Sequence, residues 1–234
     1  MQKVPNSIDN FLSGQVFLFD KPHGWSSFDV VKKIKTLIQQ KHKVKKLKVG
    51  HAGTLDPLAT GLLIVCTGKF TKKLTEIQNK SKVYTGTITL GATTPSYDLE
   101  TKPNNNYATQ HINENLILDA SKQFVGEIDQ KPPIFSALKK DGERLYKKAR
   151  RGEKIEVKSR KIYVHNFKIH SIKGLNVNFE IKCSKGTYIR SIANDFGVVL
   201  KSGGYLSKLC RTNIGEYNLS SAMTINQFEA ELNS

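Results

Sequence analysis

One loop of the sequence combines an isolated carboxylate with residue types that restrict the backbone. The loop covers residues 50–61 and holds three glycines, two threonines and a proline. Glycine lets a backbone approach a ligand closely, and Pro57 biases Asp56 toward an extended conformation. Between residues 30 and 75, Asp56 is the only carboxylate among eleven lysines. Such an aspartate could act as a nucleophile, or it could order the loop through an Asx turn, a helix cap or a salt bridge. The residues alone leave these roles open.

Enzyme classes with a short sequence signature fit this loop poorly. A glycosidase needs two carboxylates that flank the bond to be broken, and no second acid lies near Asp56 in the sequence. A Walker loop needs Gly-Lys-Ser/Thr after a strand, and Gly68-Lys69-Phe70-Thr71 departs from that pattern. His51 has no partners at the spacing of a zinc site.

The charge balance predicts a polyanionic partner. Lysine plus arginine number 37 and aspartate plus glutamate 20, which gives a net charge of +17. Nucleic acid is the first choice and an anionic membrane surface the second, with a merely solvated basic surface as the alternative. Membrane insertion is not expected, because the longest apolar run near the middle, 62–66, is far shorter than the ~20 residues of a spanning helix. The N-terminus lacks the pattern of a signal peptide.

Two segments concentrate the positive charge. Residues 41–48 hold five lysines and a histidine, and residues 139–161 hold eleven basic and four acidic residues. The sparse apolar positions of 139–161 predict a surface excursion with a short helix. We expect both segments to contact a nucleic-acid backbone, although a solvated linker is nearly as good an interpretation of 41–48.

The pattern around the loop mixes strands with helices and predicts the α+β class. Strands are expected at 16–19 and 83–90, with a hairpin over 160–183 that turns at Lys173-Gly174. Helices are expected over 30–38, capped by Ser26 or Ser27, over 188–200 and within 222–234. Residues 1–14 are expected to form a loosely held arm and 92–113 a long loop. Three widely spaced cysteines, Cys66, Cys183 and Cys210, suit buried positions in a protein of the reducing cytoplasm.

The loop at 50–61 carries the motif Gly-His-x-Gly-Thr-Leu-Asp-Pro. Further blocks between about residues 15 and 212 accompany it: Phe19-Asp20-Lys21-Pro22 with Gly24 and Ser26-Ser27, Gly68 to Lys72, Lys82-Val83-Tyr84 with Leu90-Gly91, Pro133, Ser136 to Lys139 with Gly142 and Leu145-Tyr146, Cys183 to Arg190, and Leu209. In this motif and in the order of these blocks, the chain resembles the TruB family, the bacterial tRNA pseudouridine synthase B enzymes. Ala52 stands where a threonine is more usual.

The resemblance implies an isomerase that converts uridine 55 in the T loop of tRNA to pseudouridine after flipping the base out. Asp56 would be the nucleophile, and whether it adds to the ribose or deprotonates it is left open. The bond from ribose C1′ to uracil N1 is exchanged for one to C5. No redox change occurs, so the resemblance implies no metal or organic cofactor.

The resemblance also implies roles for residues elsewhere in the chain. Arg190 would pair with Asp56 and hold it ionised. The substrate would be bound by Tyr84, which stacks on the flipped base, by His51, Tyr188 and the backbone of Leu209, and by Lys21 and Lys72. Without the resemblance, Tyr84 is a sheet aromatic, His51 a loop-bracing histidine and Leu209 a core residue, and the two lysines equally suit generic phosphate contacts.

The domain expected from the resemblance is a single pseudouridine synthase catalytic domain over 1–234, with a largely antiparallel central sheet and flanking helices. Residues 139–161 would be a basic insertion that clamps the T arm, and a C-terminal RNA-binding PUA domain is not expected. The expected partner is the T-arm stem-loop of tRNA, with no membrane, no obligate protein partner and a monomeric state. Two alternatives remain: a non-catalytic tRNA-binding or folding module, and the same chemistry on a different RNA.

Overall fold

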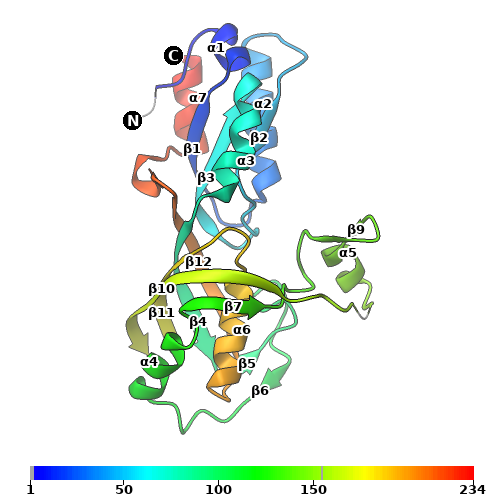
Figure 1. The fold of residues 1–234 in the computed structure, drawn as a ribbon. Coiled ribbons are helices and arrows are strands. Elements are labelled where there is room, and N and C mark those ends of the chain that lie inside the picture. The colour runs from blue at the N-terminus through cyan, green and yellow to red at the C-terminus, as the bar shows by residue number, and fades with distance from the viewer. Residues whose placement is uncertain (1–2, 154) are drawn as a thin grey trace. The chain divides into compact units, whose positions relative to one another are not determined.

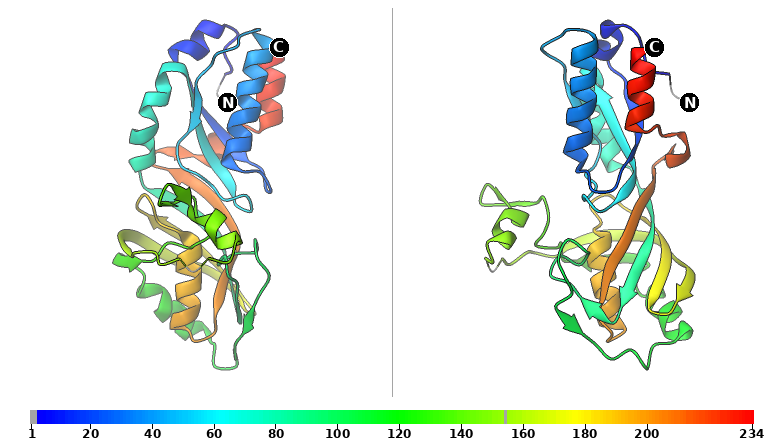
Figure 2. Two further views of the ribbon diagram at one scale, coloured as in Figure 1. Left: turned by 90° about the vertical axis from the view of Figure 1, so that its right-hand side faces the viewer. Right: turned by 180° about the vertical axis from the view of Figure 1, so that it is seen from behind.

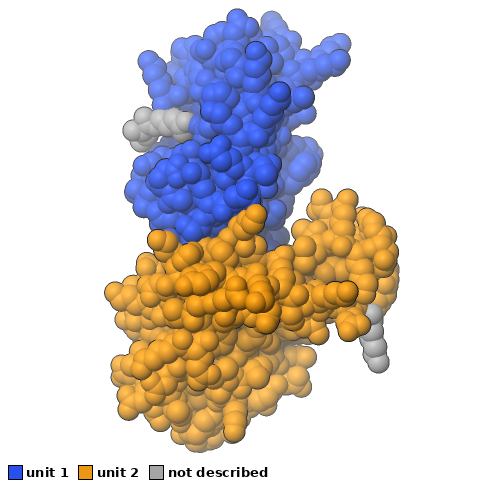
Figure 3. All heavy atoms as spheres, in the orientation of Figure 1, with its two compact units in different colours: residues 1–84, 209–234 blue, residues 85–208 orange. Residues whose placement is uncertain are grey.

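The computed structural model describes residues 3–153 and 155–234, and the chain divides into two compact units. Unit 1 comprises residues 1–84 and 209–234, and unit 2 comprises residues 85–208; Figure 3 colours them separately. The prediction of one domain over 1–234 did not anticipate this division. Among the described residues, no helix is long and apolar enough to cross a membrane.

Unit 1 contains a sheet with helices packed on it (Figure 1). Its elements are α1 (Ile8–Ser13), β1 (Val16–Lys21), α2 (Ser27–Lys41), β2 (Val49–His51), β3 (Thr60–Thr67), the 3-10 helix η1 (Gly68–Lys73), α3 (Leu74–Asn79), β13 (Tyr217–Asn218), the 3-10 helix η2 (Leu219–Ser221) and α7 (Ile225–Asn233). Strand β3 pairs antiparallel with β1 and β2, and parallel with the end of β12 (Gly204–Ile214). Strand β12 and strand β4 (Lys82–Leu90) each have residues in both units.

The core of unit 1 lies between β1 and two helices. Figure 2 shows α2 and α7 side by side in both views. Phe228 of α7 meets Phe17 and Phe19 of β1 edge to ring, with centroids 5.3 and 5.5 Å apart. Helix α2 begins at the predicted cap, because Ser26 Oγ accepts a hydrogen bond from the amide of Asp29 at 3.1 Å and the Asp29 carboxylate accepts one from the amide of Ser26 at 2.9 Å. This reciprocal cap fixes where the chain turns from β1 into α2.

The start of the chain differs from the loose arm expected for 1–14. Residues 8–13 form α1, in which Phe11 is fully buried, and Val4 is buried as well. Both side chains belong to the core cluster of unit 1. The expectation was wrong for these described residues because two apolar side chains in a polar segment suffice to anchor it when a neighbouring core accepts them.

Unit 2 packs helices on a second group of strands. Its elements are β5 (Ala92–Thr93), β6 (Asn105–Asn106), α4 (Glu114–Lys122), β7 (Gly126–Gln130), β8 (Lys139–Lys140), β9 (Glu143–Arg144), α5 (Leu145–Arg150), β10 (Arg160–Lys173), β11 (Asn176–Cys183) and α6 (Ile189–Val199). The strands follow the order β12-β4-β11-β10-β7, and β10 pairs antiparallel with both β11 and β7. Four phenylalanines form the aromatic core of unit 2. They come from the turn after α4, from β10, from β11 and from α6: Phe124, Phe167, Phe179 and Phe196.

The secondary structure confirms the α+β class and a largely antiparallel sheet. The predicted hairpin over 160–183 is β10 and β11, and its turn lies at Gly174-Leu175, one residue later than the predicted Lys173-Gly174. Two of the three cysteines, Cys66 and Cys183, are buried as expected, whereas Cys210 is half-buried. Burial raises the pKa of the Cys66 thiol to about 11, so this residue behaves as a small core side chain.

The basic insertion contains the predicted short helix. In Figure 1 and in the right-hand view of Figure 2, the hairpin β8–β9 and helix α5 stand away from the strands of unit 2. The amides of Leu145 and Tyr146 donate to the carbonyls of Leu138 and Ser136 at 2.7 and 3.0 Å, which ties α5 to the segment that precedes β8. Arg151 forms a bidentate pair with Glu143, with both contacts at 2.7 Å. The described residues therefore form an ordered, strongly basic hairpin and helix.

Candidate active site

The loop that carries Asp56 connects β2 to β3 and is held by backbone and side-chain hydrogen bonds. At its start, the amide of Ala52 donates to the carbonyl of Ile64 at 2.8 Å. Next to Asp56, Ser27 Oγ accepts from the amide of Leu55 at 2.8 Å and donates to its carbonyl at 3.2 Å. After Asp56, the amide of Ala59 donates to the Asp56 carbonyl at 3.1 Å, which closes a tight turn. These hydrogen bonds fix the backbone on both sides of Asp56, and the residue itself is half-buried.

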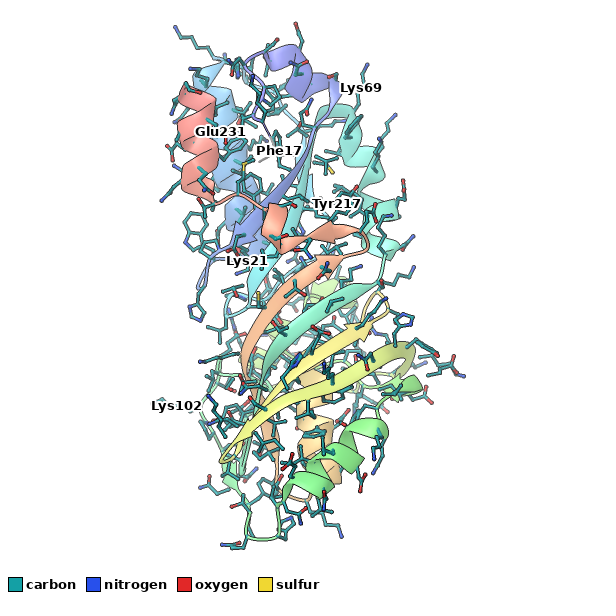
Figure 4. The ribbon with its side chains drawn as sticks, turned by 90° about the vertical axis from the view of Figure 1, so that its left-hand side faces the viewer. Phe17, Lys21, Lys69, Lys102, Tyr217 and Glu231 are labelled. Atoms are coloured by element: carbon teal, nitrogen blue, oxygen red, sulfur yellow. The ribbon has the colours of Figure 1, made fainter. Side chains whose placement is uncertain are left out.

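Lys21 supports the same turn from the end of β1 (Figure 4). Its side chain is fully buried, and its ammonium donates to the carbonyls of Trp25 at 2.5 Å, Pro22 at 3.0 Å and Pro57 at 3.3 Å. Burial lowers the pKa of Lys21 to about 8, the Asp56 carboxylate acts to raise it, and Arg211 lowers it further. In the structure the Lys21 ammonium binds three carbonyls and positions the loop beside Asp56, and its expected role as a substrate contact stays a prediction.

Arg211 holds the other side of the loop, and sequence reasoning missed it. It is 1 % exposed and is the largest fully buried side chain among the described residues. Its Nε donates to the carbonyl of Leu62 at 2.8 Å, one terminal nitrogen donates to Gly53 at 3.0 Å, and the other reaches the carbonyl of Thr54 at 3.5 Å. One guanidinium thus ties strand β3 to the residues that precede Asp56.

Gly61 lets the Arg211 backbone approach the loop. Its φ is +99°, and a Cβ there would lie 2.4 Å from the Arg211 carbonyl oxygen. Only glycine tolerates both the backbone conformation and the approach. In the sequence, Arg211 gave no signal of its own beyond lying two residues after Leu209. Its function depends on the parallel pairing of β12 with β3, which no local pattern shows.

Unit 1 contains four more of the predicted site residues. His51 ends β2 and is half-buried; burial lowers its pKa, and Arg211 lowers it further, so the ring stays neutral at pH 7. Tyr84 is 9 % exposed on β4. Leu209 is half-buried, and its carbonyl accepts a hydrogen bond from Thr60 Oγ1 at 3.4 Å at the end of the loop. Lys72 is exposed on η1, where a contact with a phosphate is sterically open.

Arg190 lies in unit 2, at the start of α6. It is 3 % exposed, and its terminal nitrogens donate to the carbonyls of Ser96 at 3.2 Å and Phe135 at 2.9 Å. Its Nε lies 3.6 Å from the carboxylate of Asp98, which is also buried. Asp98 was not predicted, because it sits in a polar segment that the sequence described only as a long loop. Ser96, Asp98 and Phe135 orient this guanidinium within unit 2, and its pairing with Asp56 of unit 1 stays a prediction.

Tyr188 caps the same helix. Its amide donates to Gln130 Oε1 at 2.8 Å and its carbonyl accepts from Gln130 Nε2 at 3.0 Å. The guanidinium of Arg160 lies over its ring, 4.9 Å from the centroid. These contacts fix the Tyr188 backbone two residues before Arg190, so both side chains are positioned by one rigid helix start.

Three comparisons with known proteins bear on this site. The model of the TruB family pseudouridylate synthase N-terminal domain matches residues 40–189. The tRNA pseudouridine synthase B of Flavobacterium johnsoniae is 58% identical over 96% of this chain and 98% of its own length. That of Phocaeicola vulgatus is 47% identical over 94% of this chain and 93% of its own length.

A solved Cbf5-Nop10-Gar1 complex contains a chain that matches with a TM-score of 0.70 and 27% identity. The match covers 94% of this chain, and the chain spans about half (54%) of that protein. A similar match, at 25% identity and the same TM-score, is to a chain of an H/ACA RNP bound to a substrate RNA containing 2'-deoxyuridine. With the family model and the two bacterial relatives, these likenesses show that the chain belongs to the TruB family of pseudouridylate synthases.

Proposed function

We propose that this protein is a tRNA pseudouridine synthase that isomerises uridine 55 in the T loop, with Asp56 as the nucleophile. The observation that carries the proposal is the loop around Asp56. Two buried cations and a buried serine of α2 fix its backbone, and Asp56 itself is half-buried. Relatives that share up to 58% of their residues with this chain bear the name tRNA pseudouridine synthase B, which supports tRNA as the substrate.

The reaction asks little of the protein beyond positioning and charge. The bond between ribose C1′ and uracil N1 breaks, the uracil turns, and C1′ bonds to C5; N1 gains a proton and C5 loses one, so atoms and electrons balance. An ionised carboxylate held beside the ribose can act on the sugar while the base is detached. The buried ammonium of Lys21 interacts electrostatically with Asp56, and an opposite charge nearby favours the ionised form of a carboxylate.

The remaining site residues receive the following roles in this proposal. Arg190 pairs with Asp56, and the carboxylate of Asp98 orients the Arg190 guanidinium within unit 2. Tyr84 stacks on the uracil, which must leave the T loop to be reached. His51 supports the flipped RNA as a neutral ring, Tyr188 and the Leu209 backbone contact the uridine, and Lys72 contacts phosphate.

The charge of the protein suits the T arm as a ligand. The insertion at 139–161 carries a large part of the net charge of +17 on the hairpin β8–β9 and helix α5. Of the lysine-rich segment 41–48, all five lysines are exposed. We assign both segments to the sugar–phosphate backbone, where they fix affinity and register without reading sequence.

The experiment that tests the function is a map of pseudouridine after incubation of unmodified tRNA with the purified protein. We expect one modified position, uridine 55, and the same modification in an isolated T-arm stem-loop. A tRNA that binds but stays unmodified would favour a non-catalytic binding module. Modification at another position, or only of another RNA, would refute the assignment of the substrate.

A further inference from the structure

A groove lies beside the catalytic loop on the outer side of helix α2. It encloses about 490 Å³ and is lined by Gly24, Trp25, Asp29, Lys32, Lys33 and Thr36, all of unit 1. None of the residues predicted from the sequence to form the site lines it. The groove is therefore a feature that the proposed chemistry at Asp56 does not use.

The lining of the groove combines an aromatic face with positive charge. Trp25 is half-buried, packs on the core of unit 1 with part of its ring, and lines the groove with the rest. Lys32 is exposed, and Lys33 pairs with Glu229 of α7 at 3.1 Å. The one acid in the lining, Asp29, is occupied by the amide and hydroxyl of Ser26 at 2.9 and 2.6 Å. An anionic ligand with a flat apolar ring matches this combination.

One end of the groove touches the catalytic loop. The amide of Gly24 donates to the carbonyl of Pro57, the residue after Asp56, at 2.9 Å. The carbonyl of Trp25 accepts from Lys21, which also binds Pro57. From this end the groove follows α2 for about two and a half turns, or about 14 Å between Ser27 and Thr36 at the helical rise. This end of the groove therefore lies next to the loop that carries Asp56.

We propose that the groove binds an unpaired nucleotide of the RNA a short way along the strand from the target uridine. Its base stacks on Trp25, and its phosphate lies at Lys32. This proposal rests on the proposed function, because it takes the strand presented to Asp56 as its ligand. Stacking on an aromatic side chain tolerates any base, so the contact adds affinity and register, and uridine specificity stays at the catalytic loop.

Trp25 is the only tryptophan of the chain, so its fluorescence reports on the groove alone. The Asp56→Asn variant is titrated with T-arm stem-loop RNA, with excitation at the red edge of the absorption band where tyrosine does not absorb. We expect quenching of the emission, and protection of the remaining emission from acrylamide, at the RNA concentration that saturates binding. An emission change on raising the protein concentration without RNA would instead indicate a second copy in the groove and would overturn the proposal.

Substitutions separate a stacked base from an indirect change at Trp25. Replacing Trp25 with Leu is expected to raise KM for the stem-loop about tenfold with kcat unchanged, while Trp25→Phe keeps most of the affinity because it keeps a ring. Lys32→Gln should raise KM. It should also make the plot of log binding constant against log salt concentration less steep by about 0.7, the value for one phosphate of a single strand. Lys122→Gln on α4, which removes the same charge from unit 2, is the control and should change neither quantity.

The outcomes distinguish failure of this proposal from failure of the proposed function. If the wild-type protein makes no pseudouridine in the stem-loop, the proposed function fails. If it does, but Trp25 stays equally open to acrylamide at saturation, or Trp25→Leu and Lys32→Gln bind like wild type, the groove is not an RNA contact. Circular dichroism shows whether a variant that loses affinity for RNA has unfolded. If Trp25→Leu has unfolded, the RNA affinities of Trp25→Phe and Lys32→Gln decide whether the groove contacts RNA.

Discussion

Arg211 gives the sharpest prediction about how the fold positions the catalytic loop. Replacing it with Lys keeps a buried positive charge but removes the guanidinium, whose nitrogens donate to the carbonyls of Leu62 at 2.8 Å and Gly53 at 3.0 Å. A single ammonium nitrogen cannot stand at both places. We therefore expect Arg211→Lys to fold, to bind tRNA, and to hold Asp56 less accurately.

The magnitude follows from the two well-formed bonds. Hydrogen bonds to a charged group contribute about 1.5–3 kcal/mol each. If Lys keeps one of them, the free energy of unfolding should fall by about 2 kcal/mol, within the ~5–15 kcal/mol of a typical domain. A displacement of about 1 Å at a reacting group can cost about 100-fold in rate. We expect kcat to fall by roughly 10- to 100-fold, with the dissociation constant for tRNA nearly unchanged.

The assay is tritium release from tRNA labelled at C5 of its uridines, because C5 loses its hydrogen in the reaction. It is run under single-turnover conditions below the unfolding temperature of each variant, with binding measured separately. Thr67→Val is the matched control: Thr67 is buried in β3, its hydroxyl accepts from the amide of Gln15 at 3.1 Å and donates to the carbonyl of Phe11 at 2.9 Å, and both partners lie outside the loop at 50–61. It should lose a similar stability and keep its rate. If Arg211→Lys retains its rate within about twofold, the loop does not depend on the two bonds of Arg211 and the reasoning is wrong. The reasoning is also wrong if Thr67→Val is slowed as much, because the slowing would then follow from lost stability alone.

Three further predictions use the same geometry. Because burial lowers the pKa of Lys21 to about 8, its ammonium is lost as the pH rises through about 8, and the rate should fall there; Lys21→Arg should remove that alkaline limb. Unfolding should not cause this fall in rate. Between pH 8 and 10.5, Lys21 binds fewer protons in the folded state than in the unfolded chain. Its contribution to the free energy of unfolding therefore increases with pH. Asp98→Asn removes the carboxylate that pairs with Arg190 and should lower kcat about tenfold. Unchanged single-turnover kinetics would show that Asp98 does not position Arg190. Gly61→Ala should destabilise the protein by more than ~2 kcal/mol, because it combines a φ of +99° with a Cβ 2.4 Å from the Arg211 carbonyl oxygen; thermal unfolding measures it.

The sequence predicted the elements with a strong local signature. The cap at Ser26, one of the two serines expected there, the strand expected at 16–19 and the hairpin at 160–183 depend on residues close together in the chain. The same holds for the loop of Asp56, because its glycines and its proline by themselves indicate a constrained backbone. Local patterns therefore sufficed for much of the fold and singled out Asp56, whereas its expected role as the nucleophile came from the resemblance to the TruB family.

The parts that sequence reasoning missed depend on contacts between distant segments. Arg211 reaches Gly53 and Leu62 across about 150 positions of the chain, and Asp98 meets Arg190 across 92. Sequence reasoning also missed that three carbonyls from two loops surround the ammonium of Lys21. The type of a basic residue does not reveal whether its partners will be phosphates or backbone carbonyls, because both are oxygen acceptors.

The most direct test of the central claim is the rate of pseudouridine formation by Asp56→Asn. The substitution keeps the size of the side chain and the backbone turn closed by Ala59, and removes the charge and the nucleophile. We predict that the variant binds unmodified tRNA with nearly wild-type affinity and forms no detectable pseudouridine at position 55. Formation of pseudouridine at near wild-type rates by this variant would contradict the account, because Asp56 would then be a structural residue of the loop.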